Sequence, residues 1–299
     1  MKIKFAIKLA ISVLLVILIL WKFPVGNIIA NLRDAKLGWV LFSFLLSELI
    51  ILNQAFRWHY LLIVPKEQKP SFATLLKYTV VGYLFNVFAP GGVGADAYRS
   101  IALGKAHNVM ASSVASVFVA RIFGLMALCL LFWLALPYSE QVPEQAVWFL
   151  AAATLFLIIF CLCVLFNPFK KGKFGLFAEK LRDYRKYPLS LLAAFFGSLL
   201  MQILSVLMYF AVFKAIGISI SWALLFTAIP VTILITAIPV SFNGIGVREW
   251  SLLTLTAYAI NSEQLLASLL LGYAVVILQA VQGWLFFSFG GSARKTRET

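Results

Sequence analysis

The chain has 299 residues, of which 63% are hydrophobic and only 12% are charged. Soluble domains are about half apolar and about a quarter charged, so this composition excludes a soluble globular protein and predicts an all-α integral membrane protein. Lysine and arginine outnumber aspartate and glutamate by 25 to 11, and because they lie beside apolar runs they indicate anionic lipid head groups and orientation signals rather than nucleic acid.

The first apolar run, residues 9–21, follows the three lysines Lys2, Lys4 and Lys8. A signal peptide and a first membrane helix share this pattern. The run is followed by Lys22-Phe23-Pro24 and not by a small-x-small cleavage site. We therefore expect a retained helix over 5–22.

Five later runs are long enough to cross a bilayer, since a spanning helix needs about 20 predominantly apolar residues. Two shorter apolar runs each end in a segment rich in glycine and proline. The three cysteines lie inside apolar runs and show neither a disulfide framework nor a zinc spacing. The five long runs are 37–57, 109–136, 145–166, 188–213 and 264–289, the two shorter ones are 72–89 and 221–239, and the cysteines are Cys129, Cys161 and Cys163.

The basic residues predict how these segments cross the membrane, because cytoplasmic loops carry an excess of Lys and Arg. Loop 167–187 is rich in both, whereas loop 137–144 has neither, which places the first inside and the second outside. Single crossings by every run would reverse both placements. Both are satisfied if 72–106 and 221–260 are re-entrant hairpins that enter from opposite sides. The basic outer segment 22–36 departs from the rule.

This topology makes residues 1–137 and 145–290 two repeats of opposite orientation, each with two spans, a re-entrant hairpin and a third span. Pro90 and Pro239 fall at matching places, and such inverted-topology repeats occur in many transporters. We therefore predict one transmembrane domain with about six full spans and two re-entrant helical hairpins. We expect a multi-pass protein of the cytoplasmic (inner) membrane, with the N-terminus and the tail 291–299 in the cytoplasm.

Two further segments have the character of interfacial helices. In 173–186, apolar residues share one helical face and basic residues cover much of the rest, which is typical of an amphipathic helix at the cytoplasmic surface, although an ordinary solvated loop is the alternative. Residues 24–36 have a weaker pattern of the same kind.

The two glycine-rich segments are the strongest candidates for a substrate-binding site. Glycines permit positive φ and close approach of other groups, and each segment leads into a predicted helix, 95–106 or 247–260. A helix N-terminus offers free N–H groups that suit a phosphate, and arginine binds phosphate through two parallel hydrogen bonds. The alternative is that these residues only form turns, with the arginines reaching the membrane surface. The candidates are Gly91, Gly92, Gly94 and Arg99 in the first segment, and Asn243, Gly244, Gly246 and Arg248 in the second.

Four other ionisable residues complete the candidate site. Asp96 and Glu249 are expected to neutralise neighbouring arginines, with proton transport as the alternative. Arg121 lies midway along 109–136, where an ionisable residue indicates function, and Glu48 is a plausible ion-pair partner, in a functional or a purely structural pair. Polar residues on the spanning helices are expected to form interhelical hydrogen bonds: Asn53, Gln54, Gln202, Gln279 and Gln282.

Residues 90–99 (PGGVGADAYR) and 243–249 (NGIGVRE) resemble the two signature motifs of the lysylphosphatidylglycerol synthase transmembrane, or flippase-like, family. The similarity extends over nearly the whole chain. It implies a membrane domain that moves aminoacylated phosphatidylglycerol between leaflets, while a separate C-terminal domain makes the lipid. Because the chain ends at Thr299, directly after the last predicted helix, we expect no such synthase domain and no synthesis of lysyl lipid.

The sequence therefore predicts a translocator of an anionic or aminoacylated phospholipid or a lipid-linked head group. Two alternatives are an integral membrane transferase with a lipid-linked donor and a non-catalytic partner of a separate synthase. No metal-binding, nucleotide-binding or hydrolase motif is visible, so no cofactor is expected. The expected partners are a membrane lipid, a separate lipid-modifying enzyme and further copies of the chain.

Overall fold

The computed structural model describes residues 17, 25–65, 67, 69–87, 89, 91–139, 141–166, 180–241 and 243–289, and all regular elements in these ranges are helices. Five of them are long and apolar enough to cross a membrane, which confirms a multi-pass helical membrane protein. They are α3 (Leu37–Leu61), α6 (Met110–Ala135), α7 (Glu144–Phe166), α9 (Pro188–Ala215) and α12 (Ser262–Phe289). The predicted span 5–22, except Ile17, and the tail 291–299 lie outside the described residues.

The outer surface of α3 shows why this bundle needs a bilayer. Five large apolar side chains at spacings of three or four residues share one exposed face: Leu41, Leu45, Leu49, Leu52 and Phe56. Soluble proteins rarely expose a continuous apolar face of this length, whereas in a bilayer it is the surface in contact with lipid chains.

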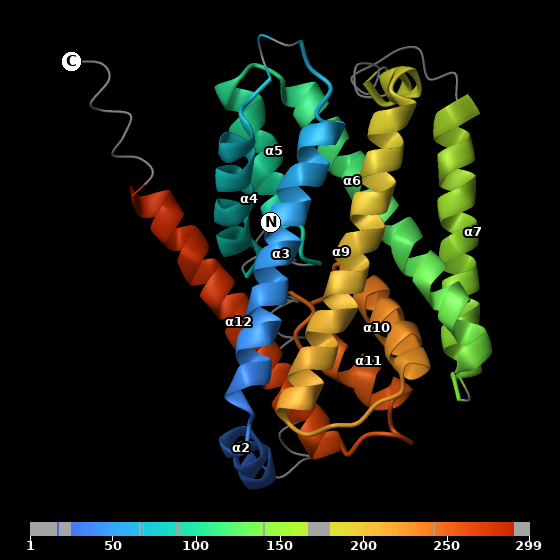
Figure 1. The fold of residues 1–299 in the computed structure, drawn as a ribbon. Coiled ribbons are helices and arrows are strands. Elements are labelled where there is room, and N and C mark those ends of the chain that lie inside the picture. Colours follow the sequence, from blue (N-terminus) through green and yellow to red (C-terminus); the bar gives the residue numbers. More distant parts are fainter. Residues whose placement is uncertain are drawn as a thin grey trace.

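Two short helical hairpins lie inside the bundle. Helices α4 (Phe72–Asn86) and α5 (Gly94–Ala106) occupy one half of its height, and α10 (Trp222–Ala237) and α11 (Val247–Leu255) occupy the other half (Figure 1). Helix α11 is shorter than the predicted 247–260, because residues 256–260 turn back with the amides of Ala259 and Ile260 on the Thr256 carbonyl.

Small residues and stacked rings hold the first hairpin together. A Cβ atom on Gly82 of α4 would lie 3.1 Å from the Ala95 Cα of α5, so only glycine allows this close approach. One turn further along, the rings of Phe85 and Tyr98 stack with centroids 4.6 Å apart.

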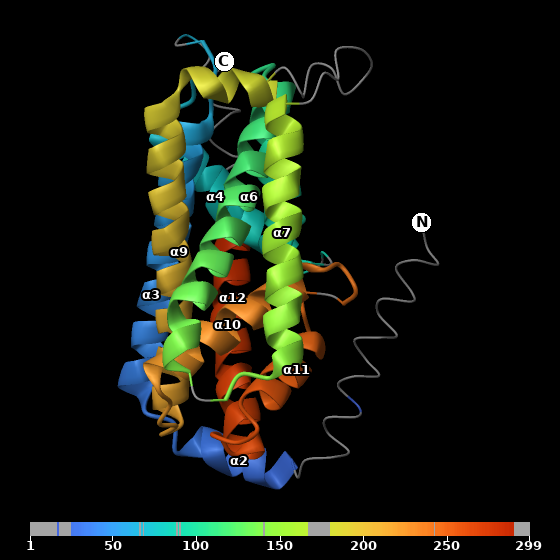
Figure 2. The same ribbon diagram turned by 90° about the vertical axis from the view of Figure 1, so that its right-hand side faces the viewer.

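The long helices surround the hairpins. Helix α3 packs along α9 through small side chains, with Ala55, Ala194 and Ser198 completely buried. The Asn53 side chain donates to the Gly197 carbonyl oxygen at 2.7 Å, one of the interhelical hydrogen bonds that the sequence predicts. Helix α4 packs on α12, α10 packs on α6, and α7 lies outside α6 (Figure 2).

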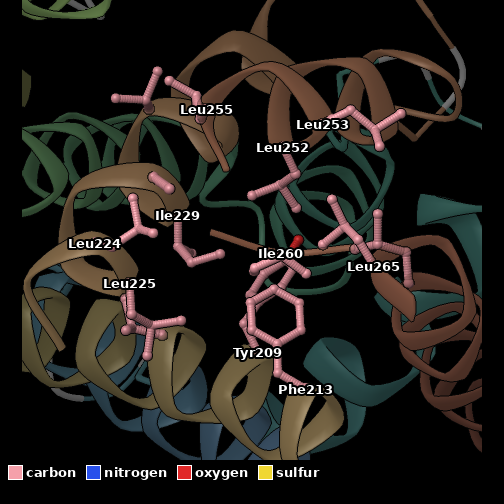
Figure 3. Close-up of a cluster of buried hydrophobic side chains, with 14 of the residues drawn as sticks. Tyr209, Phe213, Leu224, Leu225, Ile229, Leu252, Leu253, Leu255, Ile260 and Leu265 are labelled. Atoms are coloured by element: carbon pink, nitrogen blue, oxygen red, sulfur yellow. The ribbon is translucent and has the colours of Figure 1, made fainter. Parts of the chain in front are cut away.

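The largest hydrophobic cluster fixes the second hairpin in place. Side chains of α10 and α11, such as Ile229 and Leu252, interlock with Tyr209 and Phe213 of α9 and Leu265 of α12 (Figure 3). The hairpin is therefore anchored by apolar packing at its base, while its tip points toward the centre of the bundle.

Two short elements lie across the ends of the bundle. Helix α2 (Val25–Arg33) confirms the predicted helix within 24–36 and contacts α12. Residues 180–183 are helical and continue into a 3-10 helix, Tyr184–Lys186, at the opposite end (Figure 2). The Tyr184 hydroxyl donates to the Leu61 carbonyl oxygen at 2.5 Å. Most of the predicted amphipathic helix 173–186 lies outside the described residues.

Two glycines of α12 provide a test of the packing on α4. A Cβ atom on Gly283 would lie 2.7 Å from the Val80 carbonyl oxygen, whereas a Cβ atom on Gly272 would have no neighbour within 4 Å. Gly283→Ala is expected to destabilise the protein by about 1–3 kcal/mol, because overpacking forces the two helices apart. Gly272→Ala should be neutral or stabilising by up to about 1 kcal/mol. Thermal unfolding in detergent compares the two, and equal melting temperatures would contradict the packing.

Candidate functional site

The tips of the two hairpins meet at the centre of the bundle. The Gly91 amide donates to the Ser241 carbonyl oxygen and the Asn243 amide to the Ala89 carbonyl oxygen, each at 3.4 Å. Gly91 has a φ of 64°, and a Cβ atom there would lie 3.0 Å from the Ala237 carbonyl oxygen. The two glycine-rich segments, about 150 residues apart in sequence, therefore form one site. Pro90 lies outside the described residues, as does Phe242.

The glycines allow the backbones to approach each other in this contact, because they have no side chain. A Cβ atom on Gly94 would overlap the Phe85 carbonyl oxygen, and one on Gly244, which has a φ of 75°, would lie 2.9 Å from Thr236 Cγ2. Gly246 has a φ of 83° and starts α11. These positions exclude other residues by steric overlap or by backbone conformation.

A cavity of about 290 Å³ lies between the tips and the surrounding helices. Among the described residues, four guanidinium groups and one carboxylate line it: Arg57 of α3, Arg99 of α5, Arg121 of α6, Arg248 of α11 and Asp96 of α5. Of the predicted site residues, Gly91, Gly92, Asp96, Arg99, Arg121, Asn243 and Arg248 line this cavity, whereas Glu48, Gly94, Gly244, Gly246 and Glu249 do not.

Asp96 joins two of the arginines. Its carboxylate accepts from Arg99 Nη2 at 2.8 Å and from Arg121 Nη1 at 3.0 Å, so the prediction that Asp96 neutralises neighbouring arginines is confirmed. Arg121 Nη2 also donates to the Gly91 carbonyl oxygen at 3.0 Å and thereby holds the first tip.

The predicted ion pair between Arg121 and Glu48 is wrong. The Glu48 carboxylate instead accepts from Gln282 Nε2 of α12 at 3.1 Å. The face of α3 that carries Glu48 is turned toward α12, and Asp96 at the first turn of α5 takes its place beside Arg121.

Two arginines are almost completely removed from solvent. Arg57 is 4% exposed and Arg99 is 1% exposed. Arg57 Nη1 donates to Ser198 Oγ at 2.9 Å, and the Arg99 guanidinium lies 5.2 Å from the ring centre of Trp58. Within the described residues, the Nε of Arg57 and the Nε and Nη1 of Arg99 have no hydrogen-bond partner. Burying charges without full pairing costs several kcal/mol, so these donors are a costly feature of the fold.

The second tip places Arg248 on the opposite wall. Its Nη2 donates to the Asn243 carbonyl oxygen at 3.2 Å, and its guanidinium lies 5.1 Å from the ring centre of Tyr273. Glu249 acts on Arg248 through its charge, as expected, but without a hydrogen bond between the two side chains. It accepts from the Gly246 amide at 2.7 Å and from the Tyr273 hydroxyl at 2.6 Å.

The helix N-termini are less available for an anion than predicted. Glu249 occupies the start of α11, and the Asn86 side chain accepts from the Ala95 amide at the start of α5 at 2.9 Å. Side chains of the protein already satisfy these amides, as capping residues usually do. The guanidinium groups are therefore the main donors of the site.

Sequence reasoning did not select Arg57, although among the described residues it is the most buried charged side chain of the cavity after Arg99. We expected α3 to end at residue 57, whereas the helix continues to Leu61 and places Arg57 one turn inside. The apolar residues Trp58, Leu61 and Leu62, which follow it, are the signal in the sequence.

Two glutamines contribute to the same wall. Gln54 accepts from the Tyr83 hydroxyl at 3.0 Å, and Gln202 donates to the Gly124 carbonyl oxygen at 3.1 Å. These bonds confirm their predicted interhelical role, and both side chains also line the cavity.

The chain matches the family described as the lysylphosphatidylglycerol synthase TM region over residues 5–283. It belongs to this family. Membership supports a function connected with membrane lipids and confirms the resemblance seen in the two motifs. A search of the curated proteins finds no match.

Double-mutant cycles test the pairing of Arg121. Asp96→Asn and Arg121→Gln should be non-additive, with a coupling free energy of about 1 kcal/mol or more, because each removes the partner of the other. Glu48→Gln and Arg121→Gln should be additive within about 0.5 kcal/mol. Unfolding in detergent measures both cycles, and the reverse pattern would contradict the ion pairs described above.

Proposed function

We propose that this protein translocates a lipid head group across the membrane, with the head group in the cavity between the two hairpin tips. The observation that carries this proposal is the cluster of four guanidinium groups around one carboxylate in the middle of an apolar bundle. Membership in a family described as the lysylphosphatidylglycerol synthase TM region supports a lipid as the ligand, and the guanidinium groups favour an anionic one. In a membrane, such buried ionisable groups generally mark substrate paths.

We also propose that the two hairpins are re-entrant and that each belongs to one of two repeats of inverted orientation. The packing supports this proposal, because contacts of the first hairpin have counterparts in the second. Helix α4 contacts α5 as α10 contacts α11, and α4 contacts α12 as α10 contacts α6. The hairpins approach each other from opposite ends of the bundle (Figure 1). Lys69, Lys105 and residues 180–186 lie at one end, which supports a cytoplasmic position for that end.

Opening of the tips would give alternating access to the cavity. Two long backbone hydrogen bonds are the polar link between the tips in the described residues, and each contributes only about 0.5–1.5 kcal/mol. When the tips separate on one side, these two hydrogen bonds are lost. An anion bound by Arg99 and Arg248, which belong to different repeats, can therefore compensate for their free energy. Movement of one repeat against the other then transfers the head group, while the lipid chains stay in contact with the apolar outer surface.

Arginine variants test this function directly. Arg57→Gln and Arg248→Ala should each reduce transbilayer movement at least tenfold, because each removes a donor that lines the cavity. Movement is measured in reconstituted vesicles, from the protection of a fluorescent anionic phospholipid against a quencher that cannot cross the bilayer.

Arg185→Gln is the matched control, because Arg185 is exposed and does not line the cavity. It should retain the activity of the unmodified protein. Gel filtration and melting temperatures check that the cavity variants remain folded. Unchanged lipid movement in folded Arg57→Gln and Arg248→Ala would refute the proposed site.

A further inference from the structure

The charges that line the cavity do not balance. Four guanidinium groups face one carboxylate, a surplus of three positive charges, and counting Glu249 next to Arg248 still leaves a surplus of two. Arginine remains protonated under all physiological conditions, so proton loss cannot remove the surplus. A ligand must supply the missing negative charge.

In the part of the chain that the structure describes, the cavity has no carboxylate that is free of arginine and could neutralise a cation. Both oxygens of Asp96, its only carboxylate in the described residues, already accept hydrogen bonds from Arg99 and Arg121. Glu249 is engaged by the Gly246 amide and Tyr273, and Glu48 lies against Gln282 outside the cavity. The other side-chain oxygens that line the cavity in the described residues are neutral, such as those of Gln202 and Asn243, so an ammonium group on the ligand would meet a net positive charge.

We infer that the cavity selects a phosphate group with two negative charges, as in a phosphate monoester or a diphosphate, and rejects a cationic aminoacylated head group. The inference rests on the proposed function and specifies its substrate class. It differs from the lysyl lipid that the name of the family suggests.

The free donors match this chemistry. Arg57 Nε and Arg99 Nε and Nη1 are buried without partners, from two arginines that line the same cavity. A phosphate monoester offers three terminal oxygens, whereas a phosphodiester offers two and a single charge. The cavity volume of about 290 Å³ is large enough to accommodate a phosphate or diphosphate group.

A panel of short-chain lipids tests the selectivity. Purified protein in phosphatidylcholine nanodiscs is titrated with dihexanoyl phosphatidic acid, dihexanoyl phosphatidylglycerol and dihexanoyl lysylphosphatidylglycerol, with binding measured by calorimetry. Phosphatidic acid should bind at least tenfold more tightly than phosphatidylglycerol, and the lysyl lipid should not bind measurably. Affinity for phosphatidic acid should rise between pH 5 and 7.5, because a phosphate monoester loses its second proton near pH 6.

Variants locate the binding. Arg57→Gln and Arg99→Gln should each weaken phosphatidic acid binding at least tenfold, whereas Arg185→Gln should have no effect. Arg57→Lys, which retains the charge, serves as a second variant if Arg57→Gln does not fold, and it should restore part of the affinity. Binding of the lysyl lipid as tight as that of phosphatidic acid would overturn the inference.

Two further measurements separate the sources of phosphate and the two proposals. If equimolar inorganic phosphate or pyrophosphate displaces phosphatidic acid, the selectivity for charge is supported and the ligand of the cavity is a free anion. If neither displaces it, the ligand is the lipid. If the protein binds phosphatidic acid but moves no lipid in vesicles, the proposed function fails and the inference stands. If it binds and moves the lysyl lipid, the function stands and the inference fails.

Discussion

A guanidinium group in the interior of a membrane protein needs an acceptor, because neither lipid chains nor apolar side chains can replace its hydration. In this protein Arg57 and Arg99 are both almost completely buried, and three of their nitrogen atoms lack partners. Asp96 satisfies part of the charge and is itself saturated by Arg99 and Arg121. In the proposed function a bound anion offsets the remaining positive charge, and this requirement would connect the fold with the function.

The scaffold meets this requirement by bringing irregular backbone from two hairpins to one place. Backbone groups in the interior of a helical bundle must be hydrogen-bonded by protein or must face a hydrated cavity. The tips do both, since their amides and carbonyls pair across the contact while Gly91, Gly92 and Asn243 line the cavity. Helices α3, α6 and α9 enclose the tips, and the apolar cluster that includes Tyr209 and Phe213 anchors the second hairpin (Figure 3).

Much of this arrangement could be predicted from the sequence, because the bilayer imposes strong constraints on length and polarity. Apolar runs predicted the five long helices, and Pro and Gly marked both tips. Which polar side chains pair between the helices could not be predicted. Glu48 and Arg121 both lie near the middle of long helices, yet the rotation of α3 turns Glu48 toward Gln282. Likewise, we expected α3 to end at Arg57. The structure shows that the helix continues for one more turn, to Leu61, and that Arg57 lines the cavity.

The capping of the helix termini is a second feature that the sequence did not reveal. Glycine-rich segments before helices suggested free amides for a phosphate, but Glu249 and Asn86 satisfy these amides from within the protein. The sequence analysis did not assign a capping role to Glu249, and the contact of Asn86 with Ala95 depends on how the first hairpin folds. The site is therefore built from arginine side chains more than from helix dipoles.

An experimental structure of the protein in lipid nanodiscs, at a resolution that shows side chains, tests the central claim most directly. The account predicts that both hairpin tips meet within the bilayer and that phosphate density lies within hydrogen-bonding distance of Arg57 and Arg99. Hairpins that lie in water on one side of the membrane, or buried arginines that pair only with protein groups and leave no space for an anion, would contradict it.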